Sequence, residues 1–519
     1  MNRLMEKARS AGRIVLSIRF VLLMITVAYT LAYLAHPATP GNNPGQHPLG
    51  WWGWFDQGQY LLAANSIAEK NFTPEKHYYP PLYPAIGALF SKWSSGHMYF
   101  LLNLGALLWF VFVFIRFSDR YFPRWFSLFL FLGTSIIDIR IFQNYIIPWT
   151  TTLGTFFIAT GILGLIWMKE VREGRRSGIT SLQTFIVAAG LSLLLPTRPV
   201  DAAVGFILGL GFLYYYWVIL RETPNKVPGP IKFSSLIIAG ISLGPVIFFG
   251  FNTLVFGSFM GGYLHHNENN GFFPADLAEK FVSIWLDGFL LYGVSGTGLT
   301  HKLPWLLVSL AGLVWAFIQG SSLLRILGLS ISMLFILYLP YGDLLPNGLW
   351  HFLNIHYFKW TLPFLALMGA LLVAHTWQAW RMKQSRILPT ATLIGIPLLL
   401  LSLHLTLDIS PIDAGPSETF KQLKLDLKNA PIDFIDIKGM TGPFHNIYFG
   451  GHKLMIDGAP LRHVRDFRVL PMASGIRVLF IRPVQGHSLI FIPDAQLNCS
   501  DKGAFETRIG TYGFSLGIQ

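Results

Sequence analysis

The sequence has few charged residues, and this scarcity excludes most soluble folds. Asp, Glu, Lys and Arg make up 13% of the 519 residues, about half the share usual in a soluble domain. A soluble protein of this length would need charged faces on the helices around its core. Hydrophobic residues instead reach 52%, and apolar runs long enough to cross a bilayer recur along the chain. The chain is therefore predicted to be a polytopic membrane protein.

Cysteine is nearly absent, and the histidines are not grouped for metal binding. Cys499 is the one cysteine, which excludes an intrachain disulfide and a Cys-based metal cluster. His265 and His266 are adjacent, but neighbouring side chains diverge, and no second histidine cluster lies at ligand spacing. We therefore expect no bound metal and no other cofactor.

Positive charge is in excess, formally +13, but it is not gathered on one face. The basic residues are dispersed in short loops, which argues against nucleic-acid binding. Membrane topology accounts for the excess, since Lys and Arg collect in cytoplasmic loops and near anionic lipids.

Eleven transmembrane spans are predicted from the apolar runs. They cover approximately residues 14–35, 98–117, 122–138, 145–168, 180–197, 200–220, 232–256, 303–320, 326–341, 357–378 and 388–407. The first run is too long for a secretory signal, and no small-residue cleavage site follows it, so it is expected to be retained.

The distribution of Lys and Arg selects one orientation. With the N-terminus inside, the inner segments carry 19 of these residues and the outer loops carry eight. The N-terminus is therefore expected in the cytoplasm. An odd number of spans then puts the C-terminal segment outside, which is the periplasm if the membrane is a bacterial inner membrane.

Two regions depart from a plain helix bundle. Outer loops at about 36–97, 257–302 and 341–356 are long, and long loops in compact proteins usually carry function. Residues 411–519 alternate apolar and polar positions over short runs, which indicates strands. An amphipathic helix capped by Ser417 is predicted within "SETFKQLKLDLKNA". We expect a mainly α fold with a transmembrane domain at 1–409 and a small β-rich domain at 410–519.

The first outer loop contains "WFDQGQYLLAANSIAEKNF", which begins with a single acid, Asp56. The apolar residues that follow have mostly helical spacing, so a helix on the membrane surface is predicted, with tryptophans at the headgroup level. Asp56 near its start would be stabilised by the helix dipole. Two interpretations stay open here, since Asp56 either only caps this helix or performs chemistry.

Four segments, in order along the chain, resemble membrane glycosyltransferases of the GT-C class. These enzymes use polyprenyl-phosphate sugars and include protein O-mannosyltransferases and aminoarabinose transferases. The segments are W-F-D-Q-x-x-Y followed by Y-P-P-L-Y-P, then "LLLPTRPV", "FNTLVFGSFMGGYLHH" and "HYFKWTLPFLAL". The resemblance covers roughly residues 10–405.

The resemblance implies a sugar transfer at the outer face of the membrane, with inversion by a single displacement. The acid of the first loop would be the general base for the acceptor hydroxyl, and here it is Asp56. The family often has two adjacent acids, whereas Gln57 follows Asp56 in this chain. A divalent cation, which prefers several oxygen ligands, is therefore not favoured.

The leaving phosphate needs cations or oriented donors. The predicted donor-phosphate residues are Arg198, Lys359, Lys302, His301, Tyr79 and Lys76, and the predicted acceptor- or sugar-binding residues are Glu268, His265, His266, Tyr60, Trp54 and His356. Each also has a plain alternative, because charged side chains near helix ends commonly extend to the interface. Arg198 and Lys359 are the better candidates, since each lies in or beside an apolar helix, where an unpaired charge is unfavourable.

The expected partners are a polyprenyl-phosphate-linked sugar, membrane lipids, and a glycan, lipid or protein acceptor. Three alternatives differ in class: a transporter, a lipid-carrier-dependent polysaccharide ligase or flippase, and a non-catalytic scaffold of the same fold. A transporter would need polar residues near the membrane midplane and an inverted repeat, and the sequence shows neither clearly.

Overall fold

The structure of the chain is a computed structural model. It describes residues 18–36, 39, 55–93, 96–262, 277–286, 298–341, 349–350, 353–383, 423–429, 431–438, 440–441, 454–461, 466–472, 475–491, 498–499 and 507–510. Helices make up the described part before residue 384 and strands the part after 422. The predicted mainly α fold class, with a β-rich C-terminal region, is therefore confirmed.

The chain divides into two compact units. The first comprises residues 1–265, 305–337 and 355–407, and the second comprises residues 266–304, 338–354 and 408–519. The second unit thus takes in parts of two predicted outer loops besides the C-terminal segment.

Six described helices are long and apolar enough to cross a membrane, which makes this an integral membrane protein. They are α2 (Ile18–Ala35), α5 (Phe100–Ser118), α8 (Thr150–Arg172), α11 (Asp201–Glu222), α12 (Pro230–Phe256) and α20 (Thr361–Lys383). Shorter apolar helices are α4 (Leu82–Ser91), α9 (Ser181–Ser192) with α10 (Leu194–Thr197), α17 (Leu306–Ile318) and α18 (Ser322–Tyr338).

Each of the first ten predicted spans overlaps a described helix, and the eleventh, 388–407, lies outside the described residues. The span predicted at 122–138 overlaps a bent pair of helices that together are long and apolar enough for one broken span. Helix α6 (Arg124–Ser135) ends there, and the chain bends by 85° into α7 (Ile139–Ile146). Asp138 causes the new start, because its side chain caps α7 by accepting the backbone N–H of Arg140.

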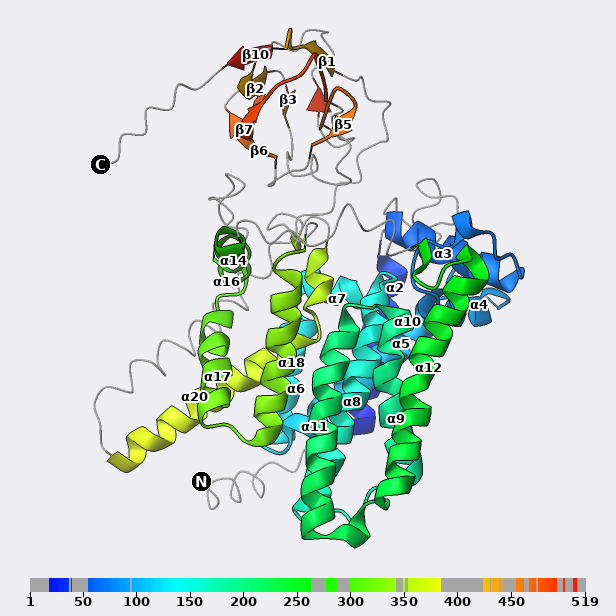
Figure 1. Cartoon of the computed structure of the whole chain (residues 1–519). Coiled ribbons are helices and arrows are strands. Elements are labelled where there is room, and N and C mark those ends of the chain that lie inside the picture. The colour runs from blue at the N-terminus through cyan, green and yellow to red at the C-terminus, as the bar shows by residue number, and fades with distance from the viewer. Residues whose placement is uncertain are drawn as a thin grey trace. The chain divides into compact units, whose positions relative to one another are not determined.

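Helix α8 lies at the centre of the helical packing in the first unit. It lies beside α5, α9 and α11 (Figure 1) and contacts all three. It is buried along most of its length. Small residues let these helices approach closely. A Cβ at Gly164 of α8 would lie 2.7 Å from Val187 of α9, so only glycine fits there without a shift.

The described part of the predicted first outer loop folds into short helices held by tyrosines. Helix α3 (Phe55–Ala68) is followed by the 3-10 helix η1 (Pro74–Lys76) and by α4. The ring of Tyr83 on α4 stacks on Tyr99 at 4.4 Å between centroids, and the Tyr99 hydroxyl donates to the Tyr60 carbonyl at 2.8 Å. The helix predicted behind Asp56 is therefore present as α3, and these rings pack it against α4 and the start of α5.

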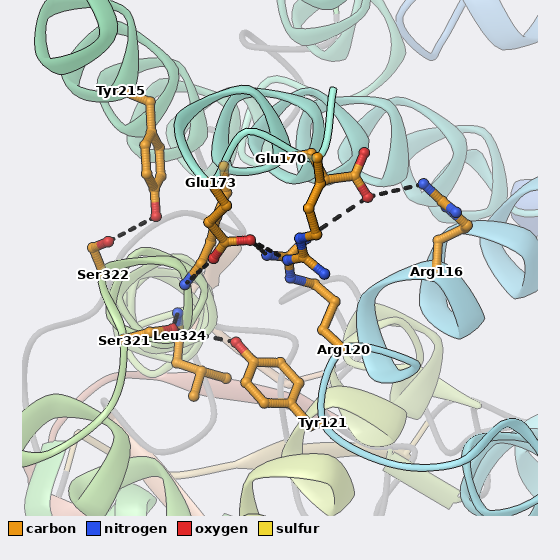
Figure 2. Close-up of polar contacts among 11 residues, drawn as sticks. Arg116, Arg120, Tyr121, Glu170, Glu173, Tyr215, Ser321, Ser322 and Leu324 are labelled. Carbon is orange, nitrogen blue, oxygen red and sulfur yellow. Dashed lines mark hydrogen bonds and ion pairs between the residues drawn. The ribbon is translucent and has the colours of Figure 1, made fainter. Parts of the chain in front are cut away.

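Ion pairs join α5 and α8 at the end that the sequence places inside. Arg116 contacts Glu170 at 2.9 Å, and Arg120 contacts Glu173 at 2.6 Å (Figure 2). In the same view the Tyr215 hydroxyl of α11 is hydrogen-bonded to Ser322 of α18. These contacts join α5 to α8 and α11 to α18 at this end of the helices.

The described strands of the second unit form small antiparallel sheets, in the orders β1-β8-β4-β5, β10-β2-β7-β6 and β3-β9. The bounds are β1 Leu423–Asp426, β2 Ile432–Lys438, β3 Met440–Thr441, β4 Leu454–Ile456, β5 Ala459–Pro460, β6 Phe467–Met472, β7 Gly475–Val484, β8 Ser488–Phe491, β9 Asn498–Cys499 and β10 Thr507–Gly510. Their core includes Ile435, Val478 and Leu489. This unit also contains α14 (Leu277–Trp285) and α16 (Leu299–Lys302).

The amphipathic helix predicted at the start of this region is wrong where the structure describes it. Residues 423–426 form β1, which pairs with β8, so that Leu423 lies opposite Phe491. Leucines alternate with Lys424 and Asp426, and this period of two fits a strand with one apolar face.

Candidate active site

Asp56 lies in the first turn of α3, and Tyr79 donates a hydrogen bond from its hydroxyl to Oδ1 of Asp56. The Asp56 side chain keeps partial exposure. Burial raises the pKa of Asp56, while the Tyr79 hydrogen bond and the positive charge of Arg198 oppose this shift. Asp56 is thus a carboxylate that one donor orients and one cation attracts.

Gln57 attaches the start of α3 to the segment that leads into α8. Its side chain is buried, and Nε2 donates to the carbonyl of Pro148 at 3.0 Å. The amide oxygen Oε1 has no hydrogen-bond partner within the described part of the chain. Gln57 therefore holds Asp56 in place relative to α8.

Arg198 follows α10 in extended backbone conformation, and its side chain is largely buried. The guanidinium carbon lies 4.2 Å from the centroid of the Tyr357 ring, a cation–π contact that replaces part of the lost hydration. Arg198 interacts electrostatically with Asp56. Through its contact with Tyr357, Arg198 also joins the end of α10 to the 3-10 helix η3 (Asn354–Tyr357).

Lys359, between η3 and α20, is fully buried. Its Nζ donates to the Asn144 carbonyl at 2.7 Å and to Oγ1 of Thr152 at 2.6 Å, and it lies 4.7 Å from the centroid of the Tyr145 ring. Burial and, less strongly, Arg198 lower the pKa of Lys359 well below its usual value. An arriving anion would stabilise the charged form of this lysine.

His356 is buried, and one of its ring nitrogens, Nε2, is not engaged by the described residues. Its ring stacks on Trp149 at 3.9 Å, and Nδ1 is 3.0 Å from Oγ1 of Thr151. Nε2 has no hydrogen-bond partner among the described residues. Burial, with Arg198 and Lys359, lowers the pKa of His356 well below its usual value, so the ring is neutral at pH 7.

Asp201, at the start of α11, was missed by the sequence reasoning. It is 4% exposed and interacts electrostatically with both Arg198 and Lys359. An acid at the start of an apolar helix is stabilised by the helix dipole, and this alone explains its presence in the sequence. Its interaction with the two cations is therefore not apparent from the sequence. The available signal was its spacing, three residues after the arginine of "LLLPTRPV".

The structure therefore brings Asp56, Arg198, His356 and Lys359 together and adds Asp201. Their mutual electrostatic interactions link α3, the end of α10, the start of α11 and the segment before α20. Two cations beside two carboxylates and a neutral imidazole are suited to hold an anion next to a base.

Of the other predicted site residues, the structure also describes Tyr60, Lys76, His301 and Lys302. Tyr60 is buried, and its ring lies 4.7 Å from that of Tyr79, so it supports the donor to Asp56. Lys76 is partly exposed on η1. His301 and Lys302 are exposed on α16, in the second unit. Four predicted residues lie outside the described part of the chain or have undescribed side chains: Trp54, His265, His266 and Glu268.

Within the described ranges, no group of three or more His, Cys, Asp or Glu side chains is arranged to hold a metal ion. Arg140, a further basic residue near the predicted outer face, forms an ion pair with Asp138 at 2.8 Å.

No protein-family model and no curated protein matches the chain. Among solved structures, it is similar to ArnT from Cupriavidus metallidurans bound to undecaprenyl phosphate, with 12% identity, 74% of this chain and 64% of that chain covered, and a TM-score of 0.45. The same protein in the apo state gives 14% identity, 75% of each chain and a TM-score of 0.42.

The oligosaccharyltransferase of Archaeoglobus fulgidus in the apo form is also similar, with 12% identity, 76% of this chain and 56% of that chain covered, and a TM-score of 0.40. The chain thus spans less than two thirds of the ligand-bound ArnT chain. At these identities and TM-scores, the similarity assigns no function to individual residues of this chain.

Proposed function

We propose that this protein transfers a sugar from a polyprenyl-phosphate donor to a hydroxyl acceptor at the outer face of the membrane, with inversion. One observation carries the proposal: the Asp56 carboxylate, oriented by the Tyr79 hydroxyl, interacts electrostatically with the buried Arg198 side chain. An acid suited to act as a base thus interacts with a cation suited to bind phosphate in an integral membrane protein.

Asp56 acts as the general base. The acceptor oxygen attacks the anomeric carbon and gives its proton to the carboxylate, while the bond from that carbon to the phosphate oxygen breaks and its electron pair leaves with the phosphate. The Tyr79 hydrogen bond to Oδ1 leaves Oδ2 available for the acceptor. A carboxylate pKa raised by burial is closer to neutral pH, where a general base works best.

Arg198 and Lys359 bind the phosphate and stabilise the charge that develops on it. Both side chains are already buried and oriented by aromatic rings, so little reorganisation is needed during the reaction. His356 contributes a neutral nitrogen for a hydrogen bond to the phosphate or the sugar.

The order of the sequence segments that resemble GT-C enzymes supports the same proposal, because each cluster residue lies in or near one of them. Asp56, Arg198 and Lys359 come from the first, second and last segments. The proposal puts the N-terminus in the cytoplasm, puts the active site and the C-terminal region outside, and takes the membrane to be a bacterial inner membrane.

The test is to incubate the purified full chain with a panel of polyprenyl-phospho-sugars and to detect release of the carrier phosphate. We expect release with at least one donor. Asp56→Asn should lose transfer by at least about a hundredfold, as expected for a general base, while it still binds the donor. Release from no donor, or undiminished turnover by Asp56→Asn, would contradict the proposal and favour a transporter or a scaffold.

A further inference from the structure

Asp201 is a buried acid that the proposed reaction does not use. It is 4% exposed at the first position of α11, and its backbone N–H donates to the Arg198 carbonyl at 3.0 Å. The carboxylate lies against the backbone of α8, since a Cβ at Gly154 would be 2.7 Å from Oδ2. The site therefore contains a second carboxylate, fixed between α8 and α11.

The cations rather than hydrogen bonds balance the charge of Asp201. In the described part of the chain, no hydrogen bond to its carboxylate is found, whereas Arg198 and Lys359 both attract it. A buried carboxylate without donors is unfavourable unless a nearby positive charge compensates it. Asp201 thus neutralises part of the positive charge of Arg198 and Lys359, the two proposed phosphate-binding residues.

We propose that Asp201 sets the charge selectivity of this site, so that it favours a phosphodiester donor over the phosphomonoester product. This inference rests on the proposed function and names the ligand charge that the same site accepts. Asp201 is a specificity-determining residue, and it takes no part in proton transfer.

A phosphodiester carries one negative charge, whereas a phosphomonoester carries roughly −1.5 to −2 at pH 7, because its second pKa is about 6. With Arg198 and Lys359 positive and Asp56 and Asp201 negative, the group is neutral before a ligand binds. The diester then adds one negative charge and the monoester adds more than one, and in a buried site the larger excess is poorly screened.

The charge of the bound phosphate changes from that of a diester to that of a monoester during the reaction. When the bond to the sugar breaks, the phosphate gains a negative charge, and Asp56 holds the proton from the acceptor. Once Asp56 returns this proton to water, Asp56, Asp201 and the phosphate all repel one another. The repulsion from Asp201 therefore favours release of the spent carrier.

The experiment compares two ligands that differ in charge but carry no sugar. A short-chain polyprenyl monophosphate and its methyl diester are titrated separately into the detergent-purified full chain at pH 8, where the monoester is a dianion. In Asp201→Asn we expect the ratio of monoester to diester affinity to rise roughly tenfold, the size expected for one unit charge acting across roughly 10 Å at an effective dielectric of about 20.

Two controls separate charge selectivity from general damage. Asp119→Asn removes another carboxylate, which contacts Arg124 at 2.9 Å near the end of α5, and it should leave the ratio unchanged. Lys359→Gln is compared with the double variant Asp201→Asn/Lys359→Gln, in which both opposite charges are removed together. If Asp201→Asn alone does not fold, the comparison of Lys359→Gln with the double variant tests the charge selectivity instead. The double variant avoids an uncompensated buried charge on Lys359.

The possible outcomes are distinct. A raised ratio in Asp201→Asn, or in the double variant relative to Lys359→Gln, supports the inference. An unchanged ratio in a folded variant overturns it, even if both ligands bind. Failure of both ligands to bind the wild-type protein would instead overturn the proposed phosphate site.

Discussion

The hydroxyl of Tyr79 donates to the carboxylate of Asp56, and this contact joins two segments of one predicted outer loop. Twenty-three residues separate the two side chains in the sequence. Helix α3, the 3-10 helix η1 and a buried tyrosine pair bring them together. The loop is thus an ordered support for one acid.

Tyr79→Phe is predicted to shift the pH dependence of transfer. Its hydrogen bond lowers the pKa of Asp56, so its loss raises that pKa further. Because the base works ionised, activity falls as the pH falls through this pKa, and the acidic limb of the kcat/KM profile should move to higher pH. On that limb we expect a loss of roughly tenfold, typical of one hydrogen bond to a charged group.

The control for this variant is Tyr83→Phe. It removes another buried tyrosine hydroxyl of the same loop, which donates to Asn103 at 3.0 Å, but it does not touch Asp56. It should lower the melting temperature without moving the pH profile. If the two variants moved the acidic limb equally, Asp56 would not be the titrating base.

Gln57→Glu is predicted to destabilise the protein by about 1–3 kcal/mol, the range for a buried acceptor left without a donor. Nε2 of Gln57 donates to the Pro148 carbonyl, and an ionised glutamate has no proton to donate. The measurement is thermal unfolding of the purified variant. The result also tests whether a second acid beside Asp56 is compatible with this site.

The matched control is Gln183→Glu, in a capping box at the start of α9. There the side-chain oxygen accepts from the backbone N–H of Thr180, which a carboxylate does equally well. We expect no loss of stability. Equal melting temperatures for the two variants would show that the contact between Gln57 and Pro148 is not required.

The sequence predicted those features that local patterns determine. Helical spacing after Asp56 indicated α3, and the unfavourable energy of a charge in an apolar helix indicated Arg198 and Lys359. Helix α7 was missed because Asp138 and Arg140 end the apolar run that predicted the span at 122–138, and only the cap at Asp138 indicates a new helix.

The detailed geometry of the site depends on contacts that no local pattern encodes. Lys359 reaches Thr152 across 207 positions, and His356 reaches Thr151 across 205. Asp201 was missed for the same reason, since its cations come from two separate segments. Such contacts between distant segments depend on how α8, α11 and α20 pack, and a single sequence does not reveal that packing.

Gly154→Ala is predicted to lower stability by about 1–3 kcal/mol, the range for an extra methyl group in a packed interior. The new Cβ would lie 2.7 Å from Oδ2 of Asp201, so the buried carboxylate must move. Gly105→Ala on α5 is the matched control, because a Cβ there meets nothing within 4 Å, and alanine in a helix is favoured by roughly 1 kcal/mol over glycine. Both variants are compared by thermal unfolding and by titration with the polyprenyl monophosphate. Equal stability and equal affinity of the two would mean that the position of Asp201 against α8 is not fixed, and that its charge does not act on a ligand from there.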